Sequence, residues 1–159
     1  MLPCKANNVV RDNRKWYSPN WTEKGEFTFC EECYHKFIKD TSLSVYIRKD
    51  GEFEACSYDF KPSVRQQWSL AVNKNDIGQF KKYVDYKIYE IKFLKAQMDT
   101  ELARQSMLIS QKGEVICLSA VSDDYGYDVE SRQIDVELSR SMDIYSSYCK
   151  KMNELCLWN

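Results

Sequence analysis

The chain has 159 residues, of which 43% are hydrophobic and 14% aromatic, and its 23 basic and 24 acidic side chains leave a formal net charge of −1. These values are typical of one globular domain and give the chain as a whole no cationic surplus for binding nucleic acid. No stretch approaches the roughly 18–20 apolar residues that a transmembrane helix needs, so we expect no contact with a membrane.

Seven cysteines point to a reducing compartment. An odd number does not suit a framework of disulfides, and the chain does not begin with the charged and apolar regions of a secretory signal. Thiols stay reduced in the cytosol and the nucleus. We therefore expect a soluble cytoplasmic or nuclear protein.

Residues 1–26 are predicted to be irregular, because Pro, Asn and Gly interrupt them at short intervals. Within them, cationic side chains alternate with large aromatic ones. Such a stretch can bind a protein partner, or it can stack on bases and hold phosphates. Alternatively, its tryptophans cover a small metal-binding lobe. The candidate partner-binding residues are Arg11, Arg14, Lys15, Trp16, Tyr17 and Trp21.

A C-x-x-C pair follows a predicted short strand over residues 27–29 and opens a predicted helix over residues 31–39. Next we expect a β-hairpin, with strands at 44–48 and 53–58 joined by an Asp-Gly turn at 49–52. The returning strand carries a further cysteine, which the hairpin would bring back toward the pair. The only four cysteines of the first 116 residues, and the predicted ligands of one structural Zn²⁺, are Cys4, Cys30, Cys33 and Cys56.

Two alternatives concern the same pair. Thiol redox chemistry at Cys30 and Cys33 would resemble that of thioredoxin-like sites, but Glu31 and Glu32 between them would raise the thiol pKa values. His35, the only histidine, could replace one thiolate, although on a helix it would point away from the pair.

Several of these residues together resemble a cysteine-rich domain that recurs in poorly characterised fungal proteins. That family combines W-Y, the phrase F-T-V-C-E-x-C-Y, a later cysteine, a segment like S-P-R-M-R, and a helix. The similarity spans residues 4–95, and the chain departs from the pattern at residues 60–65. The resemblance implies the four-cysteine metal site and no enzymatic activity. It is carried by Trp16-Tyr17, the run from Phe27 to Tyr34, Cys56-Ser57-Tyr58, Pro62, Arg65 and Trp68.

The rest of the chain is predicted to be helical. We expect a helix over residues 63–72 and an amphipathic helix from residue 77 to about 110, continuous or broken near residues 99–100. Residues 111–127 break the helical period, and residues 114–121 would form a short strand or an apolar plug. A last helix would cover residues 128–156. The long helices are expected to pair antiparallel, with Leu94, Met98 and Leu102 buried against Ile134, Leu138 and Met142.

The sequence thus predicts an α+β chain, with a zinc-binding lobe over residues 1–68 and a helical hairpin over residues 69–159. It offers no catalytic triad, phosphate-binding loop or acid–base pair, so we expect no enzyme. The leading interpretation is a zinc-binding adaptor or regulatory subunit that binds another protein. A nucleic-acid-binding regulator and a thiol redox protein are the alternatives.

Overall fold

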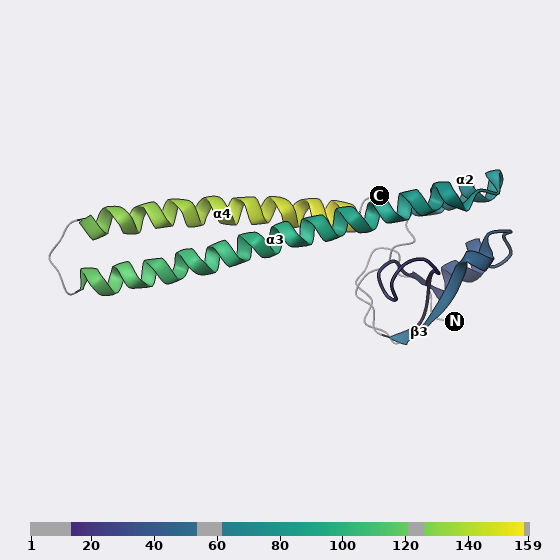
Figure 1. Ribbon diagram of the computed structural model, residues 1–159, viewed down its shortest axis with the longest axis horizontal. Coiled ribbons are helices and arrows are strands. Elements are labelled where there is room, and N and C mark those ends of the chain that lie inside the picture. Colours follow the sequence, from purple (N-terminus) through teal and green to yellow (C-terminus); the bar gives the residue numbers. More distant parts are fainter. Residues whose placement is uncertain (1–13, 54–61, 121–125, 158–159) are drawn as a thin grey trace. The chain divides into compact units, whose positions relative to one another are not determined.

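The computed structural model describes residues 14–53, 62–120 and 126–157. A small antiparallel sheet with short helices is followed by three longer helices, the last two of which form a helical hairpin (Figure 1). The predicted α+β class is therefore confirmed. The chain divides into two compact units, residues 1–90 with 154–159 and residues 91–153. The expected boundary after residue 68 stays a prediction.

The sheet has three strands in the order β2-β1-β3: β1 (Arg14–Pro19), β2 (Phe29–Cys30) and β3 (Ile47–Phe53). The central strand, β1, lies where irregular chain was expected. Residues 15–18 of this strand alternate in burial, with Trp16 and Ser18 at 0% exposure and Lys15 and Tyr17 half-buried, and Pro19 at its end is buried as well. This period of two is the pattern of a strand with one buried face, and the nearby turn-forming residues obscured it.

The Asp-Gly pair does not form the predicted turn. Strand β3 runs through it without interruption, and its pairing with β1 shifts so that Gly51 lies opposite Trp16 and Lys49 opposite Tyr17. Asp50 is the extra residue of a β-bulge, and Gly51 has a φ of +124°, which a glycine adopts at little cost. The predicted returning strand at 53–58 lies, beyond Phe53, outside the described residues.

Short helical turns connect the strands. The predicted helix after Cys30 forms as α1 (Glu31–Cys33) and continues as a π-helical turn, η1 (Tyr34–Ile38), in which Lys39 N–H donates to the Tyr34 carbonyl at 2.9 Å. A 3₁₀ turn, η2 (Ser44–Tyr46), occupies the start of the predicted strand at 44–48, so that β3 begins only at Ile47.

The core of the N-terminal unit is mainly aromatic. Trp16, Phe29 and Phe80 are fully buried, and Trp68 packs edge-on against Phe80 with their ring centroids 5.1 Å apart. Trp68 comes from α2 (Pro62–Lys74), and Phe80 from the first turns of α3 (Ile77–Ser119). Helical residues beyond position 68 therefore complete the core beneath the sheet.

The junction between α2 and α3 follows standard capping chemistry. Asn75 has a φ of +49°, and the N–H groups of Asn75 and Asp76 donate to the carbonyls of Val72 and Ala71 at 3.0 and 2.9 Å, closing the end of α2. The Asp76 carboxylate then accepts a hydrogen bond from Gly78 N–H at 2.8 Å. The helix predicted over residues 63–72 thus forms, and it runs from Pro62 to Lys74.

Helix α3 is one continuous helix of 43 residues, and α4 spans Gly126–Leu157. The predicted strand or plug at 114–121 is thus wrong, as is a break near residue 100, where Thr100 Oγ1 donates to the Ala96 carbonyl at 2.8 Å. The helix continues beyond residue 110 because Val115, seven residues after Leu108, lies on the same face of the helix and is buried in the same cluster. Within the described ranges, no helix is long and apolar enough to cross a membrane.

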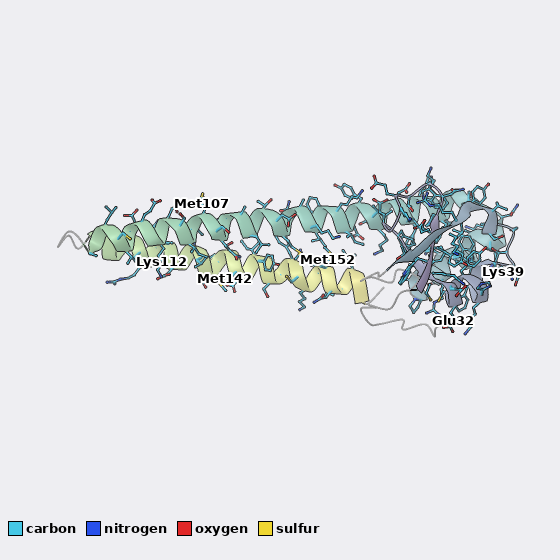
Figure 2. The ribbon with its side chains drawn as sticks, turned by 90° about the horizontal axis from the view of Figure 1, so that it is seen from below. Glu32, Lys39, Met107, Lys112, Met142 and Met152 are labelled. Carbon is cyan, nitrogen blue, oxygen red and sulfur yellow. The ribbon has the colours of Figure 1, made fainter. Side chains whose placement is uncertain are left out.

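The two long helices run antiparallel (Figures 1 and 2), but their register differs from the prediction. Ile134 packs in a buried cluster with Leu108 and Val115, and Leu138 covers that cluster. Leu102 and Met142 are instead 43% and 58% exposed. Because α3 is longer than predicted, the connection to α4 lies closer to the C-terminus. Each residue of α3 therefore faces a different residue of α4 from the one predicted. Four polar contacts between α3 and α4 agree with this observed register: Lys112–Asp135, Arg104–Glu137, Ser141–Glu101 and Tyr148–Gln97.

Leu138→Ala should lower the free energy of unfolding of the hairpin by about 2 kcal/mol, the low end for Leu→Ala, because Leu138 is only half-buried. Val136→Ala is the matched control, since Val136 is 51% exposed, and it should change stability by less than about 0.5 kcal/mol. Chemical denaturation followed by circular dichroism measures both. Equal effects of the two variants would contradict the described register.

Candidate metal centre and partner surface

The C-x-x-C pair lies at the junction of strand and helix. Cys30 ends β2, opposite Trp16 of β1, and is the N-cap residue of α1 with an extended backbone (φ −76°, ψ 163°). Cys33 ends α1. The two residues are only 1% and 3% exposed and belong to the aromatic core of the unit. The fold thus brings both cysteines to one buried turn.

The other two predicted ligands, Cys4 and Cys56, lie outside the described residues. In the part of the chain that the structure does describe, no three His, Cys, Asp or Glu side chains gather into a group that could hold a metal ion. His35 is half-buried, and its ring meets that of Tyr34 edge-on at 5.5 Å. The described residues therefore supply two thiols of the predicted site.

An ion pair lies beside the cysteine pair. Lys15 Nζ on β1 donates to Glu31 Oε1 at 3.1 Å, and this hydrogen bond is the largest cause that lowers the pKa of Glu31 below its usual value. The ammonium group partly compensates one of the two acidic charges between Cys30 and Cys33. Burial and the charge of Glu31 raise the pKa of the neighbouring Tyr17 phenol.

The predicted partner-binding stretch is divided between the core and the surface. Trp16 is fully buried, and Trp21 packs edge-on against Phe80 with a centroid distance of 6.5 Å. Tyr17 is half-buried and stacks on Tyr34, with centroids 4.0 Å apart and planes 3° from parallel. Lys15 keeps 40% of its side chain exposed.

Two members of that stretch are described only in part or not at all. Arg14 begins β1, but its side chain lies outside the described set, as does the whole of Arg11. The tryptophans of the stretch thus contribute to the fold, and Lys15, Tyr17 and Trp21 are the described members that are only half-buried.

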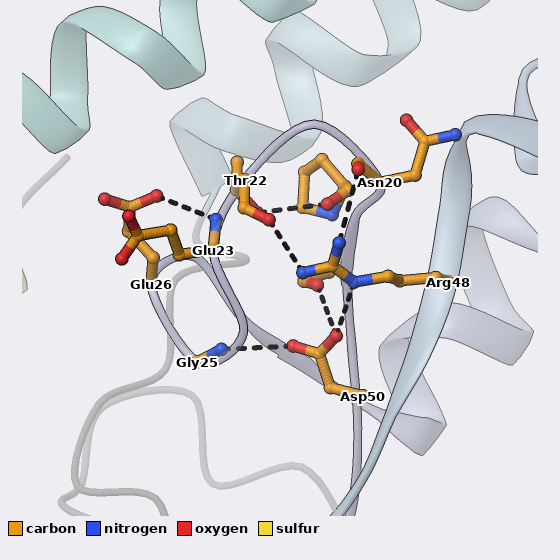
Figure 3. Close-up of polar contacts among 9 residues, drawn as sticks. Asn20, Thr22, Glu23, Gly25, Glu26, Arg48 and Asp50 are labelled. Carbon is orange, nitrogen blue, oxygen red and sulfur yellow. Dashed lines mark hydrogen bonds and ion pairs between the residues drawn. The ribbon is translucent and has the colours of Figure 1, made fainter.

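A buried carboxylate that the sequence analysis missed organises the chain next to this stretch (Figure 3). The Asp50 side chain is 0% exposed, and three groups donate to it. Ser18 Oγ and Arg48 Nε donate to Oδ1 at 2.7 and 2.8 Å, and Gly25 N–H donates to Oδ2 at 3.2 Å. A fully buried charge is tolerated when it is paired and hydrogen-bonded in this way.

The Arg48 guanidinium extends the same network into the loop between β1 and β2. It donates to the carbonyls of Asn20 and Thr22 at 3.2 and 2.7 Å, while Thr22 Oγ1 donates to the Pro19 carbonyl at 3.0 Å (Figure 3). The network therefore holds the first part of the loop, from Asn20 to Gly25, and the loop leads into the strand that carries Cys30. The sequence signal for this network was the pair Arg48 and Asp50, a basic and an acidic residue two positions apart and therefore on one face of a strand.

The second unit contains an open groove of about 410 Å³ between α3 and α4. Its floor is the apolar cluster of the hairpin, and its rim is acidic and amide-bearing. Of the rim glutamates, Glu137 is paired with Arg104. The lining residues are Leu108, Gln111, Glu114, Val115, Leu118, Glu130, Gln133, Ile134 and Glu137.

Comparison of the chain with family models, with curated proteins and with solved structures found no match.

Proposed function

We propose that this protein is a non-enzymatic zinc-binding module that docks another protein, as an adaptor or a regulatory subunit. Its structural Zn²⁺ would be bound by the thiolates of Cys4, Cys30, Cys33 and Cys56. The observation that supports this proposal is the burial of Cys30 and Cys33 together at one strand-to-helix turn. Four thiolates in tetrahedral geometry are a common closed structural site.

Burial favours a structural role over thiol redox chemistry. A redox-active pair must expose its attacking sulfur to a substrate, whereas a closed zinc site is shielded. With exposures of 1% and 3%, neither Cys30 nor Cys33 offers that access. A reducing compartment, cytosol or nucleus, would keep the four thiols available to the metal.

The metal can be tested by elemental analysis of the purified protein. We expect one zinc per chain in the wild type and none in Cys30→Ser. Cys117→Ser is the matched control, because Cys117 is exposed on α3 and belongs to the other unit. It should retain the full zinc content. A metal-free wild-type protein, or a Cys30–Cys33 disulfide in the folded protein, would exclude this site.

For the partner, we propose the exposed part of the stretch from Arg11 to Trp21. Arginine and tyrosine are among the residue types that dominate interface energies. Trp16 is fully buried, which weighs against the alternative in which it stacks on a nucleic-acid base. Arg14 and Tyr17 are the preferred probes, since the two tryptophans contribute to the core.

Arg14→Ala with Tyr17→Ala should weaken capture of the protein partner by at least about tenfold. The control pair is Lys82→Ala with Tyr86→Ala, which also removes one basic side chain and one tyrosine, from an exposed face of α3 in the same unit. Tyr17 stacks on Tyr34, so the zinc content and melting temperature must be measured in parallel. Undiminished capture, or capture lost only together with the fold, would make this surface structural. Salt-sensitive binding of RNA would support the nucleic-acid alternative instead.

A further inference from the structure

The groove between α3 and α4 has an apolar floor. Leu108, Val115 and Ile134 form this floor, and Leu118, which is 53% exposed, adds apolar surface at one end. On α3 the lining residues run from Leu108 to Leu118, which is about 15 Å at the rise of an α-helix, or nearly three turns. The groove is therefore long enough to receive a short helical segment.

Both walls of the groove are acidic. Glu114 lies on the α3 wall, and Glu130 and Glu137 lie on the α4 wall. Glu137 is paired with Arg104, whereas in the described part of the chain no cation pairs with Glu114 or Glu130. None of the nine described residues that line the groove is basic. Each wall thus carries a carboxylate whose charge is not compensated by the hairpin.

The helices around the groove are acidic as well. Residues 107–119 and 126–137 have two basic and five acidic side chains, a formal charge of −3. One of the two bases, Lys112, is already paired with Asp135. Complementary charge selects partners at an interface, so carboxylates on both walls favour a basic partner and disfavour the phosphates of nucleic acid.

The helical walls also restrict the backbone of the occupant. The N–H and C=O groups of α3 and α4 along the groove are bonded within each helix. An extended peptide would find no such groups to pair with, as it would at the edge of a sheet, whereas a helix satisfies its own backbone. Apolar side chains three and four positions apart lie on one face of a helix, with neighbouring positions on its two flanks. This arrangement matches an apolar floor between two acidic walls.

We propose that the groove binds a basic amphipathic helix of a partner protein. Its apolar face covers the floor and Leu118, and lysine or arginine side chains on its flanks pair with Glu114 on one wall and Glu130 on the other. The groove belongs to the hairpin unit. The contact therefore depends neither on the proposed zinc site nor on the stretch from Arg11 to Trp21.

Fluorescence anisotropy with the full chain tests the charges. The probe is a labelled synthetic peptide of about 15 residues, long enough to form helix, with leucines three and four positions apart and lysines on both flanks. It should bind saturably, and Glu114→Gln with Glu130→Gln should weaken binding at least about fivefold. The control, Asp99→Asn with Asp143→Asn, also removes one exposed carboxylate from each helix, but outside the groove, and should bind as wild type does. No binding, or equal weakening by both pairs, would overturn the proposal.

A second pair of variants tests the apolar contact. Leu118 and Ile116 are both 53% exposed on α3, but of the two only Leu118 lines the groove. Leu118→Ala should weaken binding of the lysine peptide at least about fivefold, and Ile116→Ala should not. Circular dichroism of each variant checks that the helices are intact.

Two further measurements test other occupants of the groove. Spermine that binds as tightly as the peptide would mean that charge alone is recognised, and it would overturn the helix. Sedimentation equilibrium of the full chain without peptide should give the same mass for wild type and Leu118→Ala. A wild-type dimer that Leu118→Ala dissociates would mean that a second copy fills the groove, and it would overturn the proposal as well.

Discussion

Removal of zinc should unfold the N-terminal unit. A structural zinc ion contributes an apparent ~10–16 kcal/mol in zinc-finger peptides at pH 7, which is more than the whole stability of most small domains. Cys30 and Cys33 belong to the aromatic core, so loss of the proposed metal would leave two buried thiolates without the cation that they bind. Addition of a strong chelator to the wild-type protein should abolish the near-ultraviolet circular dichroism of the buried tryptophans, and zinc should restore it.

The controls separate loss of metal from damage to the core. Cys30→Ser should resemble the chelated wild type and should not respond further to chelator. Cys117→Ser should respond as the wild type does, since Cys117 is exposed on α3. The far-ultraviolet signal of the hairpin should largely survive in all three proteins. A wild type whose melting curve ignores the chelator would rule out a stabilising metal.

The second large effect concerns the buried carboxylate of Asp50. Arg48→Met should lower the free energy of unfolding by about 3–5 kcal/mol, because it leaves a charge at 0% exposure without its cation. We expect the lower part of that range, since the Arg48 side chain is 37% exposed and its charge is partly solvated. Urea denaturation monitored by tryptophan fluorescence measures the change.

Two further variants decide whether the charge itself is responsible. Arg48→Met combined with Asp50→Asn should be more stable than Arg48→Met alone, since the amide is neutral, its oxygen can accept from Gly25 N–H and its NH2 group can donate to the Ser18 hydroxyl oxygen. Lys15→Met removes an ion pair whose side chains are 40% and 22% exposed and should cost about 1 kcal/mol or less. If Arg48→Met costs no more than Lys15→Met, the network is not a stabilising feature.

Local patterns were sufficient to predict most of the helical part of the chain. Apolar residues at steps of three and four predicted α3 and α4. The C-x-x-C turn between strand and helix was also predictable, because it depends on neighbouring residues alone. The sequence by itself therefore determined the α+β class, the hairpin and the position of the cysteine pair.

Interactions between distant residues decided the rest. Asp50-Gly51 would form a turn on local preference, but Arg48 and Ser18 draw the Asp50 carboxylate into the interior, and the pair becomes a bulge within β3. Gly113 and the polar residues around it suggested a break, yet the burial of Val115 against Ile134 continues α3 to Ser119. That continuation sets the register of the hairpin and leaves Leu102, Ile109 and Met142 exposed. Local preferences are worth about 1 kcal/mol or less per residue, and burial of a large side chain or hydrogen bonds to a charged group outweigh them, so only the tertiary structure could decide these elements.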